Sequence, residues 1–192
     1  MMKRALGLMT IGLAVPAPAH AAPGPFTYQC RAPYWDETGL WQLDGGPIRR
    51  VSGQIEVESL ERIPAEWPPD RELRPVGPIP DVRGAEVSLS NSEDGNINVS
   101  MGIAPAERSE DLINILLSWQ VGDQGGARQF VLPRRTGSLS RIPFAMLVDG
   151  QRVIVEAAGE RLEAPVALGS EIEFRVSCQG GTFMFYGLDW DA

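Results

Sequence analysis

Apolar and polar residues alternate along most of the chain beyond residue 25. Within residues 51–59, for example, Ile55 and Val57 alternate with Gln54, Glu56 and Glu58. Successive side chains of a strand point to opposite faces, so this pattern predicts strands that bury one face on a core. The same alternation predicts strands at residues 26–30, 86–90, 97–103, 144–148, 153–155, 172–178 and 182–188.

Turn residues separate these segments. Residues 91–95, Asn-Ser-Glu-Asp-Gly, predict a hairpin between two of the strands. Asp149-Gly150 is typical of a type I′ hairpin turn with a two-residue loop. A third turn is predicted at Gln179-Gly180-Gly181.

Residues 112–121 are more continuously apolar than the other segments. They predict a strand covered on both faces, followed after a loop at 122–126 by a partner at 129–132. A helix over 109–117 is the alternative, since Ser109, Glu110 and Asp111 could cap one. The run is short and β-branched, which favours the strand.

Nine or ten short strands with a turn every 8 to 12 residues predict an all-β fold, a single antiparallel β-sandwich of jelly-roll-like form. The pattern is broadly similar to jelly-roll domains of the lectin and laminin-G type. We expect one domain over residues 22–192. Residues 63–84 hold six prolines and predict a proline-rich surface loop.

The N-terminal segment has the order of a secretory signal peptide. Lys3 and Arg4 precede an apolar run over residues 5–15, and Ala19-His20-Ala21 is an A-x-A cleavage site. Residues 1–21 are therefore predicted to be cleaved, leaving a periplasmic or secreted protein. The apolar run is too short for a permanent span, and no stable membrane insertion is expected after cleavage.

Cys30 and Cys178 are the two cysteines of the chain. In an oxidising compartment an isolated pair most simply forms one disulfide bond, which here would close the sandwich. A redox pair is the alternative, although such pairs usually lie in a C-x-x-C motif.

The composition beyond residue 21 excludes several kinds of chemistry. The single histidine and the single lysine, His20 and Lys3, lie in the signal segment, and 15 arginines then oppose 25 acidic residues, a formal charge of −10. This charge argues against nucleic acid as a partner. Without imidazole or amine, Ser-His-Asp catalysis, histidine-ligated metals and Schiff bases are excluded.

Carboxylates and oxygen ligands are the chemistry that remains. Glu56 and Glu58 share one face of a strand at a spacing of roughly 7 Å, which a glycan hydrolase could use as its acidic pair. Asn91, Glu93, Asp94 and Asn96 crowd one turn, but turn chemistry alone recruits these residues, so no metal and no cofactor are predicted.

Tryptophans are the candidate binding residues, because sugar rings stack on exposed aromatic side chains. Trp35, Trp41 and Trp67 are the candidates, and core packing is the alternative for each. The sequence thus predicts an exported, non-catalytic binding or structural protein of the cell envelope whose partner is a glycan or a protein. The alternatives are a carboxylate-based glycan hydrolase and a protein that assembles through an exposed sheet edge.

Overall fold

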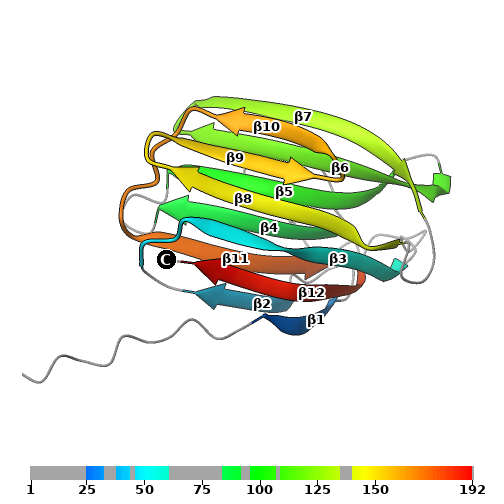
Figure 1. Ribbon diagram of the computed structural model, residues 1–192. Helices are drawn as coiled ribbons and strands as arrows, with labels where there is room; N and C mark the ends of the chain where they lie inside the picture. Colours follow the sequence, from blue (N-terminus) through cyan, green and yellow to red (C-terminus); the bar gives the residue numbers. More distant parts are fainter. Residues whose placement is uncertain are drawn as a thin grey trace, which may run out of the picture.

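Twelve antiparallel strands form two six-stranded sheets in the computed structural model (Figure 1). The structure describes residues 25–32, 38–43, 46–60, 84–91, 96–106, 109–134 and 140–191, with the backbone alone for 38–43 and 109–110. Sheet A has the order β1-β12-β3-β8-β9-β10, and sheet B has the order β2-β11-β4-β5-β6-β7. The strands are β1 (Phe26–Ala32), β2 (Thr38–Leu43), β3 (Arg50–Leu60), β4 (Gly84–Asn91), β5 (Ile97–Ala106), β6 (Ser109–Val121), β7 (Gln124–Pro133), β8 (Ile142–Asp149), β9 (Arg152–Ala157), β10 (Glu160–Ala164), β11 (Ile172–Gln179) and β12 (Gly181–Asp191).

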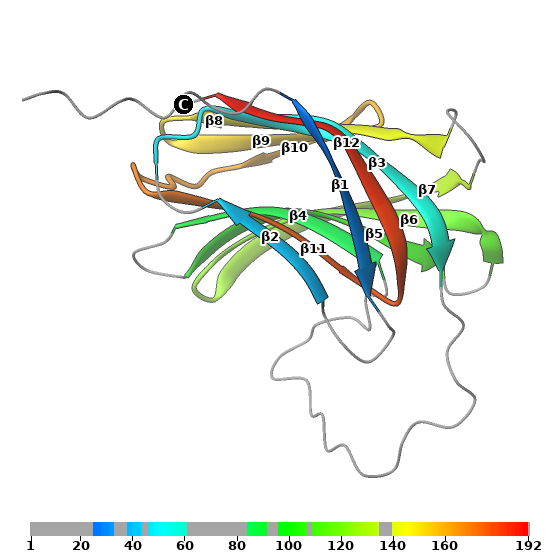
Figure 2. The same ribbon diagram turned by 90° about the horizontal axis from the view of Figure 1, so that it is seen from below.

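The two sheets pack face to face as a sandwich, which confirms the predicted fold class (Figure 2). Alternation decides which side chains enter the core. In β3, Ile55 and Val57 are buried, whereas Gln54 and Glu58 are exposed on the outer face. In β12, Phe183 and Phe185 are fully buried between the sheets. The described residues form twelve strands where nine or ten were expected, and the additional ones include β2, over residues for which no strand was predicted.

The chain changes sheets at its last turn. β11 lies in sheet B and β12 in sheet A, and a single residue, Gly180, separates them with φ +63°. The predicted turn at Gln179-Gly180-Gly181 is therefore confirmed, but it joins two sheets and is not a hairpin. Glycine suits this position because a left-handed backbone conformation carries little cost without a Cβ atom.

The hairpin between β8 and β9 differs by one residue from the prediction. Asp149 pairs with Arg152, so the loop is Gly150-Gln151 and Asp149 belongs to β8. Of these two loop residues only Gly150 has a positive φ, +55°, whereas a type I′ turn needs two. A positive φ at both loop residues occurs instead between β9 and β10, at Ala158 (+50°) and Gly159 (+88°).

Residues 109–121 form the strand β6, so the helix considered for 109–117 is wrong. The expected cover on both faces is also wrong. Ile113, Ile115 and Leu117 are buried, but the alternate side chains are only half-buried, and Leu112 is 37% exposed. The following turn is shorter than predicted, since Val121 already pairs with Gln124 and β7 begins there.

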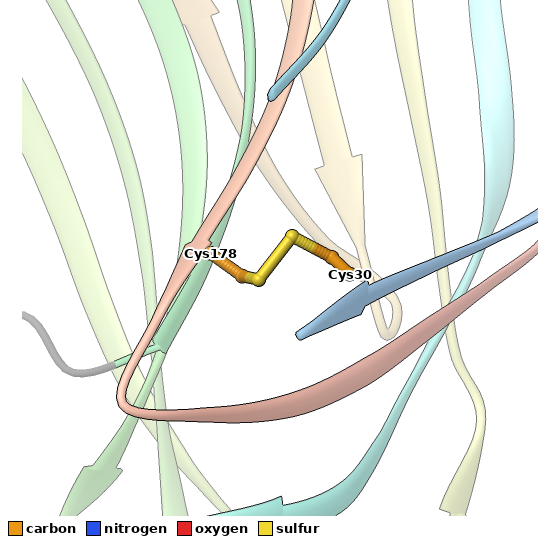
Figure 3. The surroundings of a disulfide bond; sticks show 2 residues. All are labelled: Cys30 and Cys178. Atoms are coloured by element: carbon orange, nitrogen blue, oxygen red, sulfur yellow. A yellow bond between two sulfur atoms is a disulfide. The ribbon is translucent and has the colours of Figure 1, made fainter. Parts of the chain in front are cut away.

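The predicted disulfide is present and links the two sheets (Figure 3). Cys30 lies on β1 of sheet A and Cys178 on β11 of sheet B, with 6.0 Å between their Cα atoms. Both residues are buried. The bond therefore fastens the sheets to each other at the side where β1 and β2 lie.

Two predicted segments lie outside the described residues: the signal segment 1–21, and the proline-rich loop 63–84 except for Gly84, which begins β4. Within the part of the chain that is described, no helix is long and apolar enough to cross a membrane.

Candidate functional site

Polar side chains that alternate with core residues lie on the outer faces of the two sheets, so a binding site on the sandwich is expected there or in the loops. The two faces differ in how far their small side chains are covered. On sheet A, Ser52 and Ala145 lie near the middle of the outer face and are half-buried. On sheet B, the comparable serines are buried.

Three outward-facing serines of sheet B are almost fully covered: Ser88 is 7% exposed, Ser100 6% and Ser177 9%. Their strands expose alternate residues, because the neighbours of Ser88, Val87 and Leu89, are buried core residues. Small side chains that face outward and are still buried must lie lower than the longer side chains around them. The middle of this face is therefore lined by small side chains that their longer neighbours cover.

The serines stand side by side across the sheet. Ser88 on β4 pairs with Ser100 on β5, and Ser100 pairs with Ser118 on β6. The hydroxyls of Ser100 and Ser118 lie 2.9 Å apart and hydrogen-bond to each other. We call Ser88, Ser100, Gly102, Ser118 and Ser177 the serine floor.

Two hydroxyls of the serine floor have no partner. Ser88 and Ser177 make no hydrogen bond with any residue that the structure describes. No buried side-chain polar atom of the described residues lacks a hydrogen-bond partner, so these two hydroxyl oxygens are accessible to solvent and can exchange hydrogen bonds with a ligand. This part of the site can bind a ligand rich in hydroxyl groups.

Longer polar side chains surround the serine floor. Arg175 and Glu173 on β11 form an ion pair at 3.2 Å on one side. Asn98, Gln120 and Gln129 lie on β5, β6 and β7 on the other. Val131 on the edge strand β7 is 49% exposed and lies two residues from Gln129, whereas Leu112, 37% exposed, lies six residues from Ser118 along β6. The face therefore combines hydrogen-bonding groups with an apolar side chain at its edge.

Sheet A carries a shallow hollow of about 490 Å³ on its outer face. Its polar lining comes from Arg50, Ser52 and Gln54 on β3, Arg141 before β8, and Tyr186 on β12. The Arg141 guanidinium stacks on the Tyr186 ring, 3.8 Å from the ring centroid. Its Nε also donates to Glu56 Oε2 at 3.4 Å, which holds the arginine between the two groups.

The carboxylate pair expected from the sequence, Glu56 and Glu58, lies on the outer face of β3. The Glu56 side chain is 16% exposed and forms the ion pair with Arg141, and Glu58 is exposed and accepts a hydrogen bond from Gln29 at 3.2 Å. A general acid for glycoside hydrolysis is an apolar-shielded, unpaired carboxyl group. Neither glutamate is in such a place.

The edges of the sandwich that lie opposite the disulfide are β10 and β7 (Figure 1). β10 carries Glu163, which accepts a hydrogen bond from Arg152 at 2.8 Å. Hydrogen bonds to Glu163 and Asp149 raise the pKa of Arg152. Charged side chains on an edge strand oppose pairing with another chain. β7 has one charged residue, Arg128.

The structure does not describe the side chains of the three tryptophans that were predicted as binding residues. Trp35 and Trp67 lie outside the described residues, and Trp41 lies on β2, where the backbone alone is described. The same holds for Glu93 and Asp94 of the turn considered for calcium. Among the residues that are described, no group of three or more His, Cys, Asp or Glu side chains could hold a metal ion.

Sequence reasoning missed both faces as sites. Gln54, Ser88 and Ser100 were available as the polar members of alternating strands, but alternation assigns such residues to solvent and does not say which of them their neighbours cover. Arg141 lies just before β8, outside the alternating segments, so no sequence pattern marked it as a site residue. Its place beside Tyr186 and Glu56 depends on how three strands meet.

No protein-family model and no curated protein sequence matches this chain. Among solved structures, a family 18 polysaccharide lyase matches with a TM-score of 0.52 and 10% identity, over 88% of this chain and 90% of that one. A carbohydrate-binding module from Bacillus subtilis matches with a TM-score of 0.49 and 12% identity, over 85% and 86%. A homodimeric agglutinin from chicken liver matches with a TM-score of 0.43 and 14% identity, over 79% and 99%.

At these identities the similarity defines the fold alone. This chain is a disulfide-linked, jelly-roll-like β-sandwich, built on the same plan as the lyase. What it binds has to be argued from its own side chains.

Proposed function

We propose that this protein is an exported, non-catalytic binding protein of the cell envelope, and that it holds a glycan chain on the serine floor of sheet B. The observation that carries the proposal is the pair of outward-facing serines, Ser88 and Ser177, whose solvent-accessible hydroxyls make no hydrogen bond with a described residue.

The chemistry of the face fits a sugar chain. Hydroxyl groups of a sugar both donate and accept hydrogen bonds, as do the serine hydroxyls and the amides of Asn98, Gln120 and Gln129. The less polar faces of sugar rings fit the exposed apolar side chain of Val131. Glu86 on β4 pairs with both Ser177 and Gly102 and so lies within the floor, and its negative charge favours a neutral glycan over an acidic one.

The fold supports this class of ligand. A polysaccharide is the substrate class named for the lyase whose fold matches at a TM-score of 0.52, and the proposal extends that class to this chain. Trp41 on β2 pairs with the core residue Val176 and not with an outward residue of β11, so it is not included in the serine floor. Trp35 and Trp67 are proposed as further contacts from the loops.

The hydrolase alternative is less well supported. Its acidic pair, Glu56 and Glu58, lies on the other sheet, where one carboxylate is engaged by Arg141 and the other is exposed. We therefore propose binding without cleavage. Formation of new reducing ends during incubation with a bound polysaccharide would contradict this part of the proposal.

The test is native affinity electrophoresis of the full, oxidised chain in gels that contain neutral soluble polysaccharides: xylan, galactomannan or mixed-linkage β-glucan. The informative variant is Gly102→Val. A Cβ atom at Gly102 meets only ordinary contacts, at 3.9 and 4.0 Å from Leu116, so valine fits the strand but raises the floor. We expect the retarded polysaccharide to bind this variant about tenfold or more weakly, a change of roughly 1.4 kcal/mol.

The matched control is Ser59→Val, which places the same side chain on an exposed position of β3 in sheet A. It should be retarded like the unmodified protein. Equal retardation of the Gly102→Val variant would show that the serine floor does not bind the glycan, and absence of retardation in every gel would remove the glycan from the proposal.

A further inference from the structure

The hollow on sheet A has a positive lining although the protein as a whole is acidic, with a formal charge of −8. Arg50 and Arg141 line the hollow of about 490 Å³, and no acidic residue does. We propose that this hollow is a second binding site, separate from the serine floor, and that it takes the carboxylate-bearing sugar of an acidic oligosaccharide. The inference does not depend on the proposed function of sheet B.

The two arginines have different parts in this site. Arg141 is already engaged, stacked on Tyr186 and bonded to Glu56, so it is held in place and its charge is partly balanced. Arg50 is exposed and forms no ion pair with any described residue. Its guanidinium can therefore bind an incoming carboxylate with two parallel N–H donors, a geometry that lysine does not offer.

The rest of the lining favours a sugar acid over a small inorganic anion. Ser52 and Gln54 stand beside Arg50 on the same strand and supply hydroxyl and amide groups for sugar hydroxyls. A volume of about 490 Å³ lies within the range of roughly 300–1,000 Å³ usual for organic ligands. A single phosphate or sulfate would leave most of it empty.

Two further hollows adjoin the first, which indicates a ligand of several units. One, of about 400 Å³, shares Pro143 and Phe144 with it, and the other, of about 140 Å³, shares Arg50 and Ser52. The smaller one is also lined by Asp189 and Asp191. A second carboxylate is repelled there, so the ligand should carry a neutral sugar next to its acidic one.

Isothermal titration of the full, oxidised chain with aldotriouronic acid, one glucuronic acid on two xylose residues, tests the inference. Its carboxyl-reduced form is the matched neutral ligand. We expect the acid to bind about tenfold more tightly than the reduced form, as a charge-assisted hydrogen bond requires. Raising the salt concentration from 0.05 to 0.5 M should weaken the acid alone.

Variants locate the contact. Arg50→Gln should remove the preference for the acid, and Arg50→Lys, which keeps the charge without the planar fork, should retain part of it. The control is Arg175→Gln, an exposed arginine on sheet B beside the serine floor. Melting temperatures of all three variants show that they remain folded.

Three results would overturn the inference: equal affinity for the acid and its reduced form, unchanged preference in the Arg50→Gln variant, or a loss of preference in the Arg175→Gln variant alone. The last result would place the acidic sugar on sheet B. Because the Gly102→Val variant fills only the serine floor, it should bind aldotriouronic acid like the unmodified protein. Failure of the neutral glycan to bind sheet B therefore leaves this site untouched.

Discussion

Arg128 and Glu160 form an ion pair that joins the two sheets along the edge opposite the disulfide. Arg128 lies on β7 of sheet B, and Glu160 begins β10 of sheet A. The same guanidinium donates from Nη1 to the carbonyl oxygen of Arg161 at 3.1 Å. One covalent link and one charged contact thus hold the sandwich at its two sides.

Replacing Arg128 with alanine should lower the free energy of unfolding by about 1 kcal/mol, because an exposed ion pair and a hydrogen bond to a carbonyl group are lost together. Urea denaturation measures the change. Arg175→Ala is the control, since its partner Glu173 lies on the same strand, and it should cost less than about 0.5 kcal/mol. Equal losses of unfolding free energy in the two variants would mean that the Arg128–Glu160 contact between the sheets does not stabilise the fold.

Reduction of the disulfide should destabilise the protein much more. The bond between Cys30 and Cys178 spans 148 residues, and closing a loop of that size stabilises a fold by up to roughly 5 kcal/mol. Urea denaturation with and without dithiothreitol measures this difference. The double variant Cys30→Ala and Cys178→Ala should match the reduced protein and show no response to the reductant, and a response would point to an effect other than the disulfide.

Stability should fall at alkaline pH because of Tyr28. Burial raises the pKa of this phenol, which lies near Phe185 with 6.1 Å between ring centroids. The unfolded chain then loses the proton at a lower pH than the folded one, so the stabilisation is complete below about pH 10 and is lost as the pH rises through the higher folded value. The Tyr28→Phe variant should show a shallower decline in denaturation curves above pH 10 and run parallel to the unmodified protein below pH 9. An equally steep decline would assign the effect to other groups.

Ala158→Gly should stabilise the protein. Ala158 has φ +50° in the turn between β9 and β10, a conformation that costs a residue with a Cβ atom roughly 1–2 kcal/mol. Ala158 also packs against the core, so the net gain should be nearer to about 0.5 kcal/mol. Ala145→Gly, in the middle of β8, is the control and should instead lose roughly 0.5–1 kcal/mol. Thermal denaturation distinguishes the two signs, and a loss in both variants would contradict the account of the turn.

Local pattern was enough to predict most of the fold. Alternation placed Ile55, Phe183 and Phe185 in the core, and the β-branched run at 112–121 indicated a strand where a helix was possible. Turn positions were predicted less well: the loop after β8 begins at Gly150 and not at Asp149. A shift of one residue leaves the composition of a turn almost unchanged, so composition does not fix where the loop begins. The register of the paired strands fixes that position.

The amino-acid sequence by itself determined the class of fold and the outward position of residues such as Ser88 and Gln54, because both follow from the alternation of apolar and polar residues. It also determined the disulfide, because the chain has only two cysteines to pair. Only the tertiary structure decided that Ser88 is covered while Ser52 is half-exposed, and that Arg141 contacts Tyr186 and Glu56. The curvature of a sheet and the meeting of distant strands arise from the packing of the whole sandwich, and no local pattern encodes them.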